Sequence, residues 1–73
     1  MRIGSMSVNL TVNGKALEIE GPILLLEFLK SSGVNIQFIA VAYNGDVLER
    51  EQFANVMLTE GDDLELVRPV GGG

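Results

Sequence analysis

The chain has 73 residues, of which 47% are hydrophobic, and its ten acidic and five basic residues give a formal net charge of −5. This length allows one small domain with a single core. The sequence contains neither cysteine nor histidine, which excludes disulfides, Cys/His zinc sites and catalysis by a histidine base or a cysteine nucleophile. Because the basic residues are scattered along the chain, we expect no nucleic-acid partner.

The chain has no apolar run near the length of about 18 residues that a membrane span needs, and it has no visible signal peptide. We therefore expect a cytoplasmic protein with no membrane partner. Residues 1–5 are interpreted as a cloning remnant, because Gly4-Ser5 directly precedes a second methionine, Met6. Residues 6–70 are expected to form one domain, and residues 71–73 a flexible glycine tail.

The first predicted element is a β-hairpin. Residues 8–12 and 17–20 alternate apolar and polar side chains, as half-buried strands do. Between them lies Asn13-Gly14, a pair that favours two-residue hairpin turns because both positions need φ > 0. Five side chains make up the predicted inward face: Val8, Leu10, Val12, Leu17 and Ile19.

A helix is predicted from Ile23 to Ser32, with Pro22 in its first turn and Gly33 as its C-terminal cap. Three polar residues recur at helical spacing, which indicates that they lie on the solvent face, and the residues on the opposite side of the helix then face the core. The solvent face holds Glu27, Lys30 and Ser31, and the inward face holds Leu25, Phe28, Leu29 and Ser32. Ile23 and Leu24 do not fit this pattern. We favour a hydrophobic staple at the start of the helix for them over a partner surface.

The second half of the chain has shorter elements. Residues 38–43 form an apolar strand, and Asn44-Gly45 predicts a second tight turn into a very short strand at residues 47–48. Residues 49–53 are expected to form an irregular or single-turn segment, with Phe53 pointing inward. Residues 60–63 then form a turn rich in glycine and aspartate. The carboxylates of this turn lack calcium-loop spacing, so we favour a solvated turn without a metal ion.

Residues 64–67 form the last predicted strand, and Pro69 ends its pairing because proline has no N–H to donate. Alternation turns Leu64 and Leu66 inward, and Glu65 and Val67 outward. By the same alternation, the side chain of Ala42 points to one face of the sheet, and those of Val41 and Tyr43 point to the other. The resulting fold class is α+β: a mixed sheet of four to five strands with one main helix on one face, and the first and last strands side by side in the middle.

The sequence closes with Val70, Gly71, Gly72 and Gly73. Four extended residues reach roughly 13 Å, which is enough to carry Gly73 into a pocket of another protein. Glycine has no Cβ, so such a tail is thin and its carboxylate unhindered. A frayed chain end is the alternative interpretation.

The order of these elements, the stretches Tyr43–Glu51 and Glu60–Leu66, and the glycine tail together resemble the ThiS family of bacterial sulfur carriers. The resemblance covers residues 6–73 and implies a β-grasp, ubiquitin-like fold. It further implies that an ATP-using, ThiF-type enzyme adenylates the carboxylate of Gly73, which Gly72 precedes. A cysteine desulfurase system then supplies sulfur for a thiocarboxylate, and thiazole synthase uses that sulfur in thiamin biosynthesis. The protein itself would be a co-substrate without a bound cofactor, and not an enzyme.

The same resemblance implies that the helix-free face of the sheet meets the activating enzyme. Ala42 and Val67 are then candidate contacts, with Arg68 at the rim and Val70 and Gly71 leading to the terminus. Equally, Val67 is an ordinary exposed valine. Other functions stay open: a sulfur carrier for molybdopterin synthase or for tRNA thiolation, a ubiquitin-like modifier conjugated through Gly73, or a plain binding module.

Overall fold

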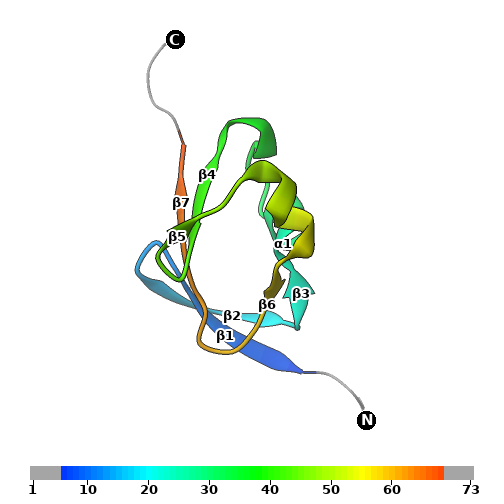
Figure 1. The fold of residues 1–73 in the computed structure, drawn as a ribbon. Helices are drawn as coiled ribbons and strands as arrows, with labels where there is room; N and C mark the ends of the chain where they lie inside the picture. Colours follow the sequence, from blue (N-terminus) through cyan, green and yellow to red (C-terminus); the bar gives the residue numbers. More distant parts are fainter. Residues whose placement is uncertain (1–5, 69–73) are drawn as a thin grey trace.

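A computed structural model describes residues 6–68, while residues 1–5 and 69–73 lie outside the described part. Five strands form one mixed sheet in the order β2-β1-β7-β4-β5, and two short strands, β3 and β6, pair beside it. The elements are β1 (Ser7–Val12), β2 (Lys15–Glu20), β3 (Ile23–Leu24), α1 (Leu25–Ser31), η1 (Ile36–Phe38), β4 (Ala40–Tyr43), β5 (Asp46–Val47), η2 (Arg50–Asn55), β6 (Met57–Leu58) and β7 (Asp63–Val67). Figure 1 shows the sheet on one side of the molecule and α1, η2 and the β3–β6 pair on the other.

The opening hairpin is confirmed. Strands β1 and β2 pair in antiparallel register from Ser7↔Glu20 to Val12↔Lys15, so the turn between them holds only two residues. Asn13 and Gly14 have φ values of 52° and 81°, as the turn type requires. The prediction that Leu17 points into the core was wrong, because its residue is 39% exposed. It lies on β2, the edge strand of the sheet, near the turn.

The predicted helix start was wrong by two residues. Ile23 and Leu24 form strand β3, which pairs with β6 through Ile23↔Leu58 and Leu24↔Met57. They are therefore not part of the helix, and α1 begins only at Leu25, whose N–H donates to the carbonyl of Val56. Leu24 is the N-cap and Ile23 packs against the core, so a hydrophobic staple at the helix start stays a prediction. A four-residue apolar run suits a buried strand as well as a helix, so periodicity could not separate the two.

The remainder of α1 follows the prediction with one exception. Leu25, Phe28 and Leu29 are buried, and the three predicted solvent-face residues are exposed. Ser32, which we expected to point inward, is exposed and donates its hydroxyl proton to the carbonyl of Phe28 at 2.8 Å. The helix ends against Gly33 at φ 79°, the left-handed conformation typical of a C-terminal cap.

The second half differs from the prediction in the bounds of its strands: β5 covers Asp46–Val47 instead of residues 47–48, and β7 begins at Asp63 instead of Leu64. Strand β4 begins at Ala40 rather than at Phe38, which lies in the 3₁₀ turn η1. The Asn44-Gly45 turn into β5 is confirmed, with Tyr43↔Asp46 as the closing pair. Segment η2 is a 3₁₀ helix that carries Phe53 into the core, as predicted.

Strand β7 is central: it pairs in parallel with β1 and antiparallel with β4, which confirms that the first and last strands are neighbours. Both Asn-Gly turns bind its backbone, since Oδ1 of Asn13 accepts from the N–H of Leu66 at 2.7 Å and Oδ1 of Asn44 accepts from that of Asp63 at 2.8 Å. The register Ala40↔Val67 is the last described pair, and the predicted effect of Pro69 falls outside the described residues.

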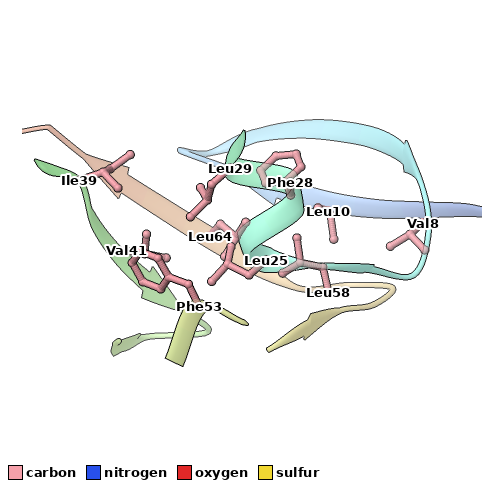
Figure 2. Packing of buried hydrophobic residues seen from close by; sticks show 10 residues of the cluster. All are labelled: Val8, Leu10, Leu25, Phe28, Leu29, Ile39, Val41, Phe53, Leu58 and Leu64. Atoms are coloured by element: carbon pink, nitrogen blue, oxygen red, sulfur yellow. The ribbon is translucent and has the colours of Figure 1, made fainter. Parts of the chain in front are cut away.

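The core lies between the sheet and α1, where side chains from both layers point toward one another (Figure 2). Ten hydrophobic residues are buried there: Val8, Leu10, Leu25, Phe28, Leu29, Ile39, Val41, Phe53, Leu58 and Leu64. Leu64 is fully buried, whereas Val67 is 59% exposed, as their alternation predicts. This packing orients the opposite face of β4 and β7 toward solvent.

Candidate functional site

The helix-free face of the sheet carries an exposed apolar strip. We define it as Phe38, Ala40, Ala42, Val47 and Val67. In the sheet register Ala40 pairs with Val67, and Ala42 pairs with both Glu65 and Val47, so these paired side chains point to the same side. Val47 is 78%, Phe38 64% and Val67 59% exposed. Three large apolar side chains left in solvent on one face are a feature of interaction surfaces.

A shallow hollow of about 460 Å³ lies at one end of this strip. It is lined by Gln37, Phe38, Ile39, Ala40, Arg50 and Val67. Residues from η1, β4, η2 and β7 thus surround a single depression beside the end of β7. In Figure 1 the green turn that leads into β4 lies at the same end of the molecule as the end of β7.

Arg50 is hydrogen-bonded to η1, the segment that carries the lining residues Gln37 and Phe38. Its Nη2 donates to the carbonyl of Gln37 at 2.6 Å, and its Nε donates to the carbonyl of Ile36 at 3.3 Å. Both carbonyls belong to η1, so the guanidinium group ties η2 to the turn that presents Phe38. Asn35 stabilises the start of the same turn by accepting a hydrogen bond from the N–H of Gln37.

A second hollow of about 400 Å³ continues from the first across Ile39, Ala40 and Arg50. Its remaining lining is Val47, Leu48, Glu49, Glu51 and Phe53. Its two carboxylates outnumber the single guanidinium group of Arg50, so this part of the surface has a net negative charge next to apolar atoms. The arrangement suits a partner that offers an apolar side chain close to a basic one.

The other end of β7 carries the cluster of polar groups around Asp62. This residue is only 7% exposed, so the prediction of a fully solvated turn was wrong at this position. Its carboxylate accepts hydrogen bonds from the hydroxyl of Tyr43 and the N–H of Thr59, both at 2.9 Å, and from Nδ2 of Asn44 at 3.2 Å. Burial alone disfavours the charged form, but these donors more than offset it, and the pKa of Asp62 lies below its usual value.

Two neighbours of this cluster have shifted pKa values as well. Burial, and then the hydrogen bond to Asp62 and its negative charge, raise the pKa of Tyr43. Two hydrogen bonds from the backbone and side chain of Asn9 lower the pKa of Glu60. The carboxylates of Asp62 and Glu60 are thus satisfied by protein donors that join β1, β4 and the turn before β7.

The sequence-predicted site residues divide into two groups. Ala42, Val67 and Arg68 lie within the described part: Ala42 and Val67 belong to the strip, and the exposed Arg68 directly follows β7. Val70, Gly71, Gly72 and Gly73 lie outside the described residues. The structure therefore shows the surface next to the predicted reacting end.

Sequence reasoning missed four residues of this surface: Phe38, Ala40, Val47 and Arg50. A signal was present for Phe38 and Ala40. In the predicted strand 38–43, every second residue points to the same face, so Phe38 and Ala40 would share the face of Ala42. The pairing of Arg50 with the carbonyls of η1 has no such signal, since it joins segments 13 and 14 residues apart without a motif.

Within residues 6–68 no three acidic side chains are grouped so that they could hold a metal ion. In the same part of the chain no helix is long and apolar enough to cross a membrane. The feature that this face offers within residues 6–68 is the exposed apolar strip with its adjoining hollow.

The fold has close counterparts among solved structures. The chain matches a thiamine biosynthesis protein (ThiS) from Geobacter metallireducens in a crystal structure, with 36% identity, a TM-score of 0.78, and coverage of 90% of this chain and 100% of that one. A solution structure of a thiamine biosynthesis protein from the same organism gives 38% identity and a TM-score of 0.76, covering 90% of this chain and 88% of that one. Ubiquitin from Caldiarchaeum subterraneum shares the fold, at 18% identity and a TM-score of 0.52 over 96% of this chain and 100% of that one. The class of protein is thus a ubiquitin-like β-grasp domain.

The family model of the ThiS family matches residues 10–73. The chain belongs to the ThiS family, as its sequence resemblance implied. It is also 29% identical, over 66 residues, to a thiazole synthase of Paramagnetospirillum magneticum. That match covers 90% of this chain, which spans only about a fifth of the length of that relative.

Proposed function

We propose that this protein is a sulfur carrier whose reacting group is the carboxylate of Gly73. The observation that carries the proposal is the ThiS family match, which runs through Gly73 and therefore includes all three glycines. In the proposed reaction a carboxylate oxygen of Gly73 bonds to the α-phosphorus of ATP and pyrophosphate leaves. The terminal sulfur of a protein persulfide then forms a bond to the carbonyl carbon and AMP leaves, which gives an acyl disulfide. A thiol reductant cleaves its S–S bond and is oxidised to a disulfide, and the released thiocarboxylate is the sulfur donor.

All catalysis in this scheme belongs to the partner enzymes, and the carrier is their co-substrate. A carboxylate is a poor electrophile, and the acyl-adenylate gives it a good leaving group. Gly72 and Gly73 suit this role because glycines thread a narrow channel and place no Cβ beside the reacting carbon. ATP is bound by a ThiF-type adenylating enzyme, and the sulfur comes from a cysteine desulfurase system in the cytoplasm.

The acceptor of the sulfur in this proposal is a thiazole synthase, in the pathway to thiamin. The support is the relative from Paramagnetospirillum magneticum, in which a segment similar to this chain forms part of a protein named thiazole synthase. A carrier domain and its acceptor enzyme joined in one chain would work at high effective concentration.

The helix-free face is proposed as the surface that docks on the activating enzyme. Val67 and Ala42 contribute apolar area there, Arg68 lies at its rim, and Val70 and Gly71 connect it to the reacting end. The support is the exposure of the strip together with the fact that β7, which leads directly to the glycines, forms part of it.

Intact-mass spectrometry tests the function. The protein is incubated with a ThiF-type enzyme, ATP, a cysteine desulfurase with cysteine, and a thiol reductant, and its mass should rise by the difference between one sulfur and one oxygen. The control is the same mixture without ATP. Isopeptide conjugates on lysines of other proteins would instead indicate a ubiquitin-like modifier, and an unchanged mass would indicate a plain binding module.

A second assay separates the pathways. The thiocarboxylate form is offered in parallel to thiazole synthase, to the large subunit of molybdopterin synthase and to a tRNA-thiolating enzyme. Sulfur transfer to thiazole synthase alone is the expected result, and preferred transfer to either of the others would overturn the thiamin assignment.

A further inference from the structure

We propose that Phe38, held in place by Arg50, is the apolar anchor through which this protein docks on the enzyme that adenylates Gly73. The inference rests on the proposed function and adds an anchor and a positioning residue to it. Phe38 is the exposed aromatic side chain of the strip, and it lines the hollow beside the end of β7 together with Val67.

The length of the chain beyond β7 restricts where the partner must lie. Five residues separate Arg68 from the end of Gly73, and they reach about 17 Å when fully extended. An enzyme that holds Gly73 in its active site therefore has to bring its surface within that distance of Arg68. The hollow lined by Phe38 and Val67 lies close to Arg68, because Val67 directly precedes Arg68 in the chain.

The chemistry of the two joined hollows indicates what the partner offers. The first is walled by Phe38, Ala40 and Val67, and takes an apolar side chain. The second brings Glu49 and Glu51 to the same surface, and the chain as a whole carries a charge of −5. The occupant is accordingly an apolar side chain of the adenylating enzyme with a basic side chain next to it.

Arg50 is a positioning residue in this arrangement. Its guanidinium group donates one hydrogen bond each to the carbonyls of Ile36 and Gln37, the residues directly before Phe38. These bonds hold the backbone that carries Phe38, so less backbone freedom is lost when Phe38 binds a partner, which favours affinity. Arg50 thus acts on binding through Phe38 and not through its own charge.

The test measures steady-state adenylation, as pyrophosphate release by a ThiF-type enzyme at varied carrier concentration. Phe38→Ala should raise KM roughly tenfold with kcat unchanged, the signature of lost binding that is equal in ground and transition states. Phe38→Leu should recover most of the loss because it restores apolar bulk. Met57→Ala, which removes an exposed apolar side chain from β6, is the matched control and should leave KM unchanged.

Arg50 is tested by a double-mutant cycle. Arg50→Ala should raise KM by itself but add little in the Phe38→Ala background, because the two residues act as one unit. If the effects of the two substitutions on KM add fully in the double variant, Arg50 does not act through Phe38 and the positioning role is overturned. An unchanged KM for Phe38→Ala, with the wild-type protein adenylated, would overturn the anchor but leave the proposed function intact. If the wild-type protein is not adenylated at all, the proposed function fails and the anchor fails with it.

Discussion

The hydroxyl group of Tyr43 donates a hydrogen bond to Oδ2 of Asp62 at 2.9 Å, which joins the last residue of β4 to the turn that precedes β7. The same carboxylate accepts from Thr59 and Asn44, so one buried aspartate holds together the turn between β4 and β5 and the turn before β7. This cluster lies at the beginning of β7, while the apolar strip reaches its end. The buried polar cluster and the exposed apolar strip are therefore separated along one strand.

Removing the hydroxyl group by Tyr43→Phe should lower the free energy of unfolding by about 1 kcal/mol, because one hydrogen bond to a buried carboxylate is lost. Urea denaturation followed by circular dichroism measures this change. In an Asp62→Asn background the same substitution should cost clearly less. An equal cost in both backgrounds would show that Tyr43 does not stabilise the fold through Asp62.

The stability of the protein should depend on pH at both ends of the scale. Because the pKa of Asp62 is lower in the folded than in the unfolded chain, its contribution is complete above the usual value of 3.8 and disappears as the pH falls through the folded pKa. The raised pKa of Tyr43 acts in the opposite sense, so stability should fall as the pH rises above 10.0. Thermal melts from pH 2 to 11 test both slopes. Asp62→Asn should flatten the acid slope and also weaken the alkaline one, because Asp62 contributes to the raised pKa of Tyr43.

Neighbouring residues of β6 offer a matched test of the core. Leu58 is fully buried and Met57 is exposed. Leu58→Ala should cost about 2–5 kcal/mol through lost contacts and the cavity left behind, which is most of the stability of so small a domain. Met57→Ala should stay within about 0.5 kcal/mol of the wild type. Similar costs for both in chemical denaturation would contradict the burial seen at β6.

The docking face can be probed at Val67 without touching the core. Val67→Asp places a charge in the apolar strip and should raise the KM for adenylation by roughly tenfold or more, with little change in Tm. Val67→Thr keeps the shape of the side chain and should have a smaller effect. Normal activation of Val67→Asp would exclude this end of the strip from the interface.

The glycine tail is tested by Gly72→Val. A β-branched side chain next to the reacting residue should block adenylation by crowding the narrow channel, while Tm stays unchanged because Gly72 follows the end of β7 by five residues. Gly4→Val, near the other end of the chain, is the control. Adenylation of Gly72→Val at the normal rate would rule out the channel argument.

Much of the fold could be predicted because its signals are local. Alternation and the Asn-Gly pairs identified the hairpin, the turn into β5 and the faces of β7, since side-chain direction in a strand and positive φ in a tight turn depend on adjacent residues alone. The inward face of α1 followed from helical spacing in the same way. The resemblance carried by the turns and the glycine tail identified the family, which the comparisons then confirmed.

Three of the failures share a cause, because each depends on what lies opposite in space. Those at Ser32 and Phe38 are local, since Ser32 bonds the carbonyl of Phe28 and Phe38 belongs to η1. Ile23 and Leu24 became a strand since Met57 and Leu58, more than 30 residues away, offered a partner. Leu17 stayed exposed because β2 is the edge strand, and Asp62 was buried because Tyr43, Asn44 and Thr59 converge on it.

The sequence by itself determined the order of α1 and the five strands of the main sheet, the alternating faces of those strands, and the glycine-rich end, because these depend on the pattern of neighbouring side chains. Only the tertiary structure decided which of the outward residues form one surface. It brings Phe38, Arg50 and Val67 around a single hollow through pairing between β4 and β7 and through hydrogen bonds between η2 and η1. Such long-range contacts are fixed by the packing of the whole chain, and no short stretch of sequence encodes them.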